Sequence, residues 1–255
     1  TEAGAVMHTG RSNPQQLLVA PHTGAVLKHI VSEMRRVHRE KFGKDDDLVI
    51  GIQLTHSGRY SHPNKADVLE PVTAYQHPLL DKKFHCSAAN VVTDEEVGNI
   101  VQHFIAAAKV AQEAGFDFVD IKSAHGYLGH EFLTAYDRPG KYGGSFENRT
   151  RFFREIAEGI QKNVPGLDIS ARVSLFDVFP FVKGGDGVGH PMEWPAGTRY
   201  PYSFGGDGTG MDMDPDLKET VQFIDMLGEF GVGMICATIG SPYYNVHMQR
   251  PAYYP

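Results

Sequence analysis

The stretch DFVDIKSAHGYLGHEFLTAYDRPGKYGGSFENRTRFF, residues 117–153, contains one complete strand–loop–helix unit. It opens as an apolar strand that stops at Lys122, and His125 and Tyr127 follow closely in a polar loop. A glycine pair then leads into a helical pattern that starts near Ser145. A strand, a polar loop and a helix in this order are the repeating unit of parallel α/β proteins.

The same alternation recurs along the chain. Apolar runs predict buried strands at 48–54, 114–122, 167–176 and 231–240, with a fragment of a fifth at Thr1–Ala5. Apolar periodicity and capping signals predict helices at 23–42, from the capping box of Thr93 and Glu96, from Ser145, and from Asp214–Pro215. Regular alternation of this kind indicates either a (β/α)8 TIM barrel or a doubly wound sheet.

Three features favour the barrel. No GxGxxG motif follows a strand, as a dinucleotide-binding crevice would require. Polar residues cluster after several strand ends, where barrel active sites lie. Long irregular segments, 56–92 and 175–213, follow strands at the same ends. Because a closed barrel needs eight strands, the sequence predicts either an incomplete barrel or a different parallel fold.

Length and composition are those of one globular domain, and we expect 1–255 to form it. A net charge of −7 argues against nucleic acid or an anionic membrane as a partner. Two distant cysteines, Cys86 and Cys236, provide neither a disulfide framework nor a metal-binding spacing. We therefore expect a cytoplasmic protein without a secretory leader, a membrane span or a metal site.

Two polar residues interrupt apolar strands. Arg172 shares a face with Ser170 and Ser174, and burying its charge requires an anionic partner. That partner is either a structural carboxylate or an electron-rich ring in the barrel mouth. Gln53 likewise needs partners for both ends of its amide, which a flat heterocycle or a neighbouring backbone supplies.

The cluster of Lys122, His125 and Tyr127 is the strongest candidate site. A tyrosine hydroxyl is a general acid, and histidine or lysine donates hydrogen bonds to a developing oxyanion. The alternative for each residue is a structural role: a lysine that extends to solvent, a core histidine and a packing tyrosine. Three such residues at one strand end favour function.

Motifs distributed over nearly the whole chain carry a family resemblance. They are GIQLTHSGR, GFDFVDIKSAHGYLGHEFL, YGGSFENRTRFF, ARVS and GSPYYNVHMQRPA. In this order and at these separations they resemble the old yellow enzyme family, the NADH:flavin oxidoreductases. The resemblance implies a barrel that holds FMN noncovalently, takes a hydride from NADH or NADPH, and passes it to an activated alkene.

The resemblance also assigns roles to four residues. Gln53 matches the glutamine that reads the pyrimidine edge of the flavin, and Arg172 matches the arginine beside its N1 and C2 carbonyl. His125 matches the second residue of the pair that holds the substrate carbonyl oxygen. Tyr127 matches the tyrosine that protonates the α-carbon.

The sequence departs from the family pattern in two respects. Lys122 stands where the family has the first histidine of the substrate-binding pair, which leaves the substrate class open. The resemblance runs only from the end of the second barrel strand through the sixth. We therefore expect this sequence to be part of a longer chain, with a lid-like insertion at 183–213 and the FMN phosphate site elsewhere.

Two other functions remain open at this point. A lysine at a barrel strand end, near a tyrosine, is also typical of a Schiff-base lyase, with Lys122 as nucleophile. A catalytically inactive, barrel-derived scaffold subunit is the non-enzymatic alternative. The sequence identifies a small molecule as the partner, but it does not distinguish NADH from NADPH, name the substrate, or decide whether the protein is a homo-oligomer.

Overall fold

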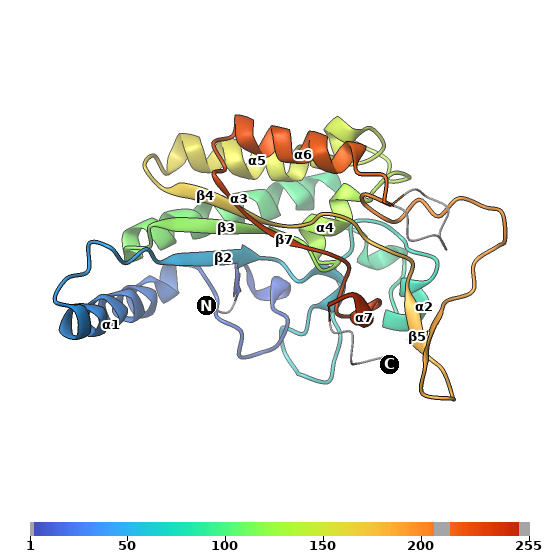
Figure 1. The fold of residues 1–255 in the computed structure, drawn as a ribbon, viewed down its shortest axis with the longest axis horizontal. Coiled ribbons are helices and arrows are strands. Elements are labelled where there is room, and N and C mark those ends of the chain that lie inside the picture. The colour runs from blue at the N-terminus through green and yellow to red at the C-terminus, as the bar shows by residue number, and fades with distance from the viewer. Residues whose placement is uncertain (1–2, 207–214, 250–255) are drawn as a thin grey trace.

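The computed structural model describes residues 3–206 and 215–249, and a parallel sheet runs through it (Figure 1). Five strands lie in the order β1-β2-β3-β4-β7, and every neighbouring pair is parallel. Their bounds are β1 Gly4–Ala5, β2 Gly51–Thr55, β3 Phe118–Ser123, β4 Asp168–Ser174 and β7 Met234–Thr238. A separate antiparallel pair comprises β5 Phe181–Lys183 and β6 Gly189–Pro191.

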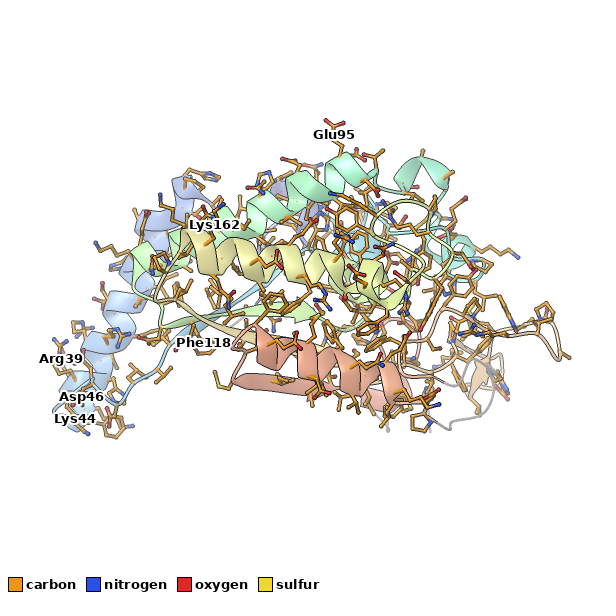
Figure 2. The ribbon with its side chains drawn as sticks, turned by 90° about the horizontal axis from the view of Figure 1, so that it is seen from above. Arg39, Lys44, Asp46, Glu95, Phe118 and Lys162 are labelled. Atoms are coloured by element: carbon orange, nitrogen blue, oxygen red, sulfur yellow. The ribbon has the colours of Figure 1, made fainter. Side chains whose placement is uncertain are left out.

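Four long helices pack against one face of this sheet. The long ones are α1 Gly24–Phe42, α3 Asp94–Ala114, α5 Phe146–Asn163 and α6 Lys218–Glu229. The shorter ones are α2 Leu80–Phe84, α4 Leu128–Leu133 and α7 Val246–Gln249, with 3-10 turns at His8–Gly10, Pro21–Thr23, Gly58–Tyr60 (η3) and Ala88–Asn90. Figure 2 shows α3, α5 and α6 side by side over the sheet.

The predicted elements are confirmed with small shifts of their ends. The four strands lie where the apolar runs predicted them, and β1 contains part of the expected fifth fragment, of which residues 1–2 lie outside the described range. The five strands follow one another across the sheet in chain order, and all are parallel, which agrees with the predicted incomplete barrel. The described part of the predicted 183–213 insertion contains β6, while its residues 207–213 lie outside the described range.

The local signals for helix starts were correct at two of three helices. Glu96 N donates to Thr93 Oγ1 at 3.2 Å and Thr93 N donates to Glu96 Oε2 at 2.7 Å, which is the predicted capping box of α3. Ser145 caps α5 by accepting from Asn148 N at 3.3 Å. The predicted start of α6 at Asp214–Pro215 was wrong: Pro215 forms an antiparallel bridge with Gly206, so its backbone is extended and the helix begins at Lys218. Asp214 itself lies outside the described residues.

Alternation along the strands separates the core from the site. Side chains on the helix-covered face are buried in the main apolar cluster, among them Ile52, Leu54, Val119, Ile121, Ile169, Ala171 and Val173. The residues between them, which face away from these helices, include Gln53, Asp120, Lys122, Ser170 and Arg172. The sheet therefore packs an apolar core on one side and presents polar groups on the other.

Helix α1 differs from the other long helices in what it buries. Leu27 and Val31 are buried, whereas Val26, Ile30, Met34 and Val37 are between 36% and 58% exposed. The helical spacing of the sequence was thus confirmed, but most of its apolar positions remain at the surface. Among the described residues, no helix combines the length and the apolar character that crossing a membrane requires.

Gly58 permits the close approach of η3 to α4. Its φ is +62°, and a Cβ there would lie 2.8 Å from the backbone nitrogen of Leu128.

We expect Gly58→Ala to lower the free energy of unfolding by about 2 kcal/mol or more, because the left-handed backbone alone costs ~1–2 kcal/mol. Gly98→Ala is the control: nothing lies within 4 Å of its Cβ, and the helix should gain about 0.5–1 kcal/mol. Denaturant unfolding measures both changes, and equal effects at the two positions would contradict the packing described here.

Candidate functional site

The polar face of the sheet brings together side chains from three neighbouring strands, β2, β3 and β4. Gln53 on β2 is in register with Asp120 on β3, and Asp120 with Ser170 on β4. One pair further along, Lys122 is in register with Arg172. The predicted positions of Gln53, Lys122 and Arg172 on neighbouring strands are therefore confirmed.

Asp120 is a polar residue of this face that sequence analysis did not single out. Burial raises the pKa of its carboxyl group, while the nearby Gln53, Arg172 and Ser170 side chains act in the opposite direction. Its place in the strand pattern, two residues before Lys122, was the available signal. A short acidic side chain there puts a hydrogen-bond acceptor between the amide of Gln53 and the guanidinium of Arg172.

Arg172 lacks the tight carboxylate partner that a purely structural role requires. Within residues 3–206 and 215–249, Arg172 forms no ion pair with a carboxylate, and its buried Nε has no hydrogen-bond partner. The charge of Asp120 reaches it only at longer range. A buried donor without a partner in the protein is satisfied by water or by a ligand, so Arg172 is able to bind an acceptor from outside the chain.

A cavity of about 410 Å³ lies beside this guanidinium. Its lining combines Arg172 and Leu175, at the end of β4, with residues at the ends of β7 and α7, namely Ala237, Thr238, Ile239, Met248 and Gln249. The volume is within the range of small-molecule and cofactor sites. A flat heterocycle with acceptor atoms along one edge therefore fits both the space and the free donor of Arg172.

The loop after β3 has a backbone conformation that ordinary residues avoid. His125 has φ of 66° and Gly126 has φ of 73°, so two consecutive residues lie in the left-handed region. Contacts from three elements hold this turn: His125 N donates to Ser174 Oγ at 3.1 Å, Ser241 Oγ donates to the His125 carbonyl at 2.9 Å, and Gly126 N donates to His130 Nδ1 at 2.8 Å. Strain held by so many bonds is typical of functional sites.

His125 is a neutral imidazole in this turn. Burial, and then the positive charges of Lys122 and Arg172, lower its pKa to about 3. Its Nε2 lies 3.3 Å from Thr238 Oγ1, at the end of β7. A neutral histidine can donate one hydrogen bond to a substrate oxygen without a change of its own charge.

Lys122 is buried and lies against the predicted proton donor. Its Nζ is 3.4 Å from the centre of the Tyr127 ring, which is a cation–π geometry. Burial, and then the charge of Arg172, lower the pKa of Lys122 to about 7, while Asp120 acts in the opposite direction. Near neutral pH the ammonium and the amine forms of this side chain therefore have similar populations.

Tyr127 completes the cluster that the sequence predicted. It is 6% exposed, and its hydroxyl shares a hydrogen bond of 2.9 Å with the hydroxyl of Tyr243, in the loop after β7. Tyr60 packs nearby, with its ring stacked on Tyr243 at 3.9 Å. Lys122, His125 and Tyr127 thus lie together, at the same end of the sheet as Arg172.

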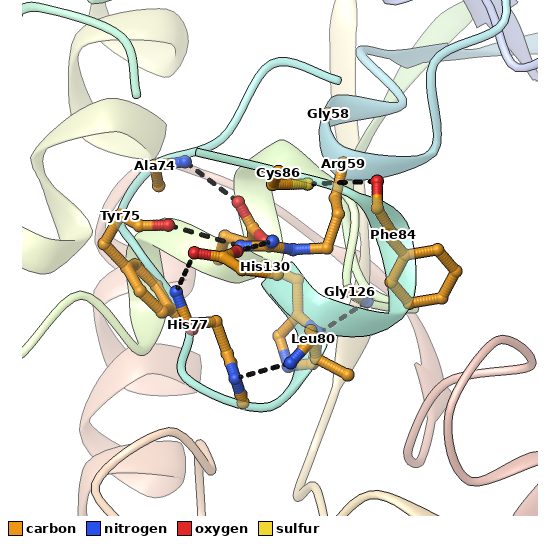
Figure 3. Close-up of polar contacts among 12 residues, drawn as sticks. Gly58, Arg59, Ala74, Tyr75, His77, Leu80, Phe84, Cys86, Gly126 and His130 are labelled. Carbon is orange, nitrogen blue, oxygen red and sulfur yellow. Dashed lines mark hydrogen bonds and ion pairs between the residues drawn. The ribbon is translucent and has the colours of Figure 1, made fainter. Parts of the chain in front are cut away.

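Arg59, the last residue of the GIQLTHSGR motif that contains Gln53, belongs to a structural network (Figure 3). Its Nε donates to Glu131 Oε1 at 2.6 Å, its Nη1 pairs with Asp81, and its Nη2 donates to the Tyr75 carbonyl at 3.2 Å. Glu131 Oε2 also accepts from Ala74 N at 2.9 Å. This network ties the loop after β2 to α4, but none of its members faces the cavity beside Arg172.

Comparisons with known proteins agree with the motifs. A model of the NADH:flavin oxidoreductase / NADH oxidase family matches residues 36–194. The NADPH dehydrogenase of Clostridium acetobutylicum is 34% identical over 192 residues, covering 73% of this chain and 51% of that protein. The NADPH dehydrogenase of Bacillus subtilis is 42% identical over 137 residues, covering 52% of this chain and 38% of that protein. The chain therefore spans about half the length, or less, of these two curated relatives.

Solved structures support the same fold. Morphinone reductase superimposes with a TM-score of 0.52 at 25% identity, covering 68% of this chain and 48% of that chain. A complex of 2-naphthoyl-CoA reductase gives a TM-score of 0.63 over 94% of this chain and 32% of that chain, and at 20% identity this likeness concerns the fold alone. The predicted α/β barrel fold, incomplete in this chain, is confirmed.

The lowered pKa of Lys122 makes stability depend on pH. Between pH 7 and 10.5 the unfolded chain binds a proton that the folded protein has released, so the free energy of unfolding should rise with pH across this window. Below pH 7 Lys122 is a buried cation in the folded protein, and the full cost of burying this charge lowers the free energy of unfolding. Lys122→Met keeps about the length of the side chain but removes the titrating group. We expect it to reduce the rise of the free energy of unfolding with pH, by up to ~1.4 kcal/mol for each pH unit by which the pKa of Lys122 is lowered.

Denaturant unfolding of the flavin-free protein at a series of pH values measures this effect. Lys109→Met is the control, because that side chain is 65% exposed on α3. Parallel pH profiles for the wild type and Lys122→Met would show that Lys122 is not buried as a strained cation.

Proposed function

We propose, since this chain belongs to the NADH:flavin oxidoreductase / NADH oxidase family, that it forms a single FMN-binding barrel domain of an oxidoreductase. The reaction passes a hydride from NADH or NADPH, through FMN, to an activated alkene or a related unsaturated substrate. The observation that carries this proposal is the unpaired donor of Arg172, beside a cavity and at the same sheet end as a proton-donor cluster. A scaffold has no need for this combination.

The residues that would hold FMN are Gln53 and Arg172. Gln53 offers an amide donor and an acceptor for a pyrimidine edge, and the guanidinium of Arg172 offers charge-assisted donors. Bound FMN supplies the chemistry that the chain lacks, the acceptance and release of a hydride. A fixed cation such as Arg172 favours the negative charge that the reduced cofactor carries.

The loop after β3 would act on the substrate. His125, neutral and held by its strained turn, donates a hydrogen bond to the substrate carbonyl oxygen, and Lys122 adds a positive charge at short range. Both interactions strengthen as the oxygen becomes negative during hydride addition. The hydroxyl of Tyr127 then gives its proton to the α-carbon.

A second function has one observation in its favour. A pKa of about 7 for Lys122 is what a Schiff-base lyase needs, because the free amine is the nucleophile. Arg172 and Gln53 have no role in that reaction, so we rank it second. Borohydride reduction in the presence of a panel of aldehydes and ketones separates the two functions: a covalent adduct on Lys122 would favour the lyase.

Replacing Arg172 tests the cofactor site. We expect Arg172→Ala to weaken FMN binding by about tenfold to a hundredfold, because a hydrogen bond to a charged group contributes roughly 1.5–3 kcal/mol. The reduction potential of the bound FMN should fall, because the reduced anion loses its counter-charge. Arg36→Ala on the exposed side of α1 is the control. Fluorescence titration with FMN and a dye-coupled potential measurement give the two readouts, and an unchanged potential would exclude the charge-stabilising role.

Replacing Tyr127 tests proton donation. We expect Tyr127→Phe to bind FMN and accept hydride from NAD(P)H as the wild type does, and to reduce an enone about 10²- to 10⁴-fold more slowly, the usual contribution of a general acid. Anaerobic stopped-flow measurement follows bleaching by NAD(P)H and recovery by the enone separately. Wild-type recovery in the variant would show that another group protonates the substrate.

A further inference from the structure

The hydroxyl of Tyr127 does not act alone in the described structure. It lies 2.9 Å from the hydroxyl of Tyr243, and the two rings are 5.9 Å apart at an angle of 30°. Tyr127 is 6% exposed, whereas Tyr243 is only partly buried. A proton lost from Tyr127 is therefore most directly replaced through this neighbour, which lies closer to solvent.

Tyr243 is held in place from several sides. Its ring stacks on Tyr60 with centroids 3.9 Å apart and planes at 10°, and its carbonyl accepts from Lys83 Nζ at 2.9 Å. Its backbone nitrogen donates to Ser241 Oγ at 3.2 Å, and the same hydroxyl donates to the carbonyl of His125 at 2.9 Å. The loop that carries Tyr243 is therefore coupled to the turn that carries His125, so the two tyrosine hydroxyls are oriented before substrate arrives.

We infer that Tyr243 is a positioning and proton-relay residue for Tyr127, an inference that rests on the proposed function. In the step concerned, the O–H bond of Tyr127 breaks and a C–H bond forms at the α-carbon of the substrate, which has already received the hydride that NAD(P)H supplies. The Tyr127 oxygen is left negative and accepts a hydrogen bond from Tyr243. The proton of Tyr243 then moves to Tyr127, and water returns a proton to Tyr243, so one hydride and one proton are consumed in each turnover.

A purely structural role for Tyr243 makes a different prediction. Tyr60, Leu80, Tyr127 and Tyr244 form a small apolar cluster against which Tyr243 packs, and a packing role needs the ring but not the hydroxyl. Tyr243→Phe removes only the hydroxyl and keeps the stacked ring. Tyr60→Phe is the matched control, because it also removes a hydroxyl group from this cluster. The hydroxyl of Tyr60 has no hydrogen-bond partner among the described residues.

The first experiment is stopped-flow recovery of the NAD(P)H-reduced protein with two alkenes. With an enone, Tyr243→Phe should be slower by about tenfold to a hundredfold, the value of a hydrogen bond to a charged oxygen, and Tyr60→Phe should match the wild type. A nitroalkene gives a stable nitronate after hydride addition and needs no immediate proton, so its rate should be the same in all three proteins.

The second experiment does not depend on turnover. The ¹³C resonance of the hydroxyl-bearing ring carbon of Tyr127, measured in flavin-free protein, should shift in Tyr243→Phe and not in Tyr60→Phe. An unchanged resonance, or an unchanged enone rate in Tyr243→Phe while the wild type turns over, would overturn the relay and leave the proposed function standing. A wild-type protein that reduces no alkene would overturn the proposed function, and the relay with it, even if the resonance shifts.

Discussion

The ion pairs of Arg59 hold the loops on which the site depends. Its side chain is fully buried, and it pairs with Glu131 on α4 and with Asp81 on α2. Breaking a buried pair by removing one partner costs roughly 3–5 kcal/mol, because the remaining charge stays in a low-dielectric interior. Arg59 therefore links the loop after β2 to α2 and to α4. Since α4 begins directly after Tyr127, this network also holds the position of Tyr127.

The charges on the polar face of the sheet form a second constraint. Lys122 and Arg172 lie in register on neighbouring strands, and each disfavours the protonation of His125. Burial is nevertheless the larger cause of the lowered pKa values, both for Lys122 and for His125. A ligand that brings negative charge reverses part of this effect by linkage, because it raises the pKa of Lys122. The face is therefore arranged for an electron-rich ligand, which is consistent with the family to which the chain belongs.

Much of this arrangement could be predicted from local signals. The apolar runs placed four strands correctly, and the capping residues Thr93 and Ser145 marked two helix starts. The alternation of side chains along β4 correctly predicted that Arg172 lies on the opposite face of the sheet from Ala171 and Val173. The prediction of a helix start failed at Pro215. Proline is suited both to the first turn of a helix and to an extended segment, and the bridge with Gly206 places Pro215 in an extended segment.

By itself the sequence determined the order of strands and helices, the face of each strand that meets the helices, and the grouping of Lys122, His125 and Tyr127 at one strand end. Those properties follow from periodicities of two and 3.6 residues, which act over short distances along the chain. Only the tertiary structure decided that Tyr243 reaches Tyr127, that Arg172 lacks a carboxylate partner, and that His125 is held in a left-handed turn. These depend on contacts between residues about 50 to 120 positions apart, whose distances no local pattern specifies.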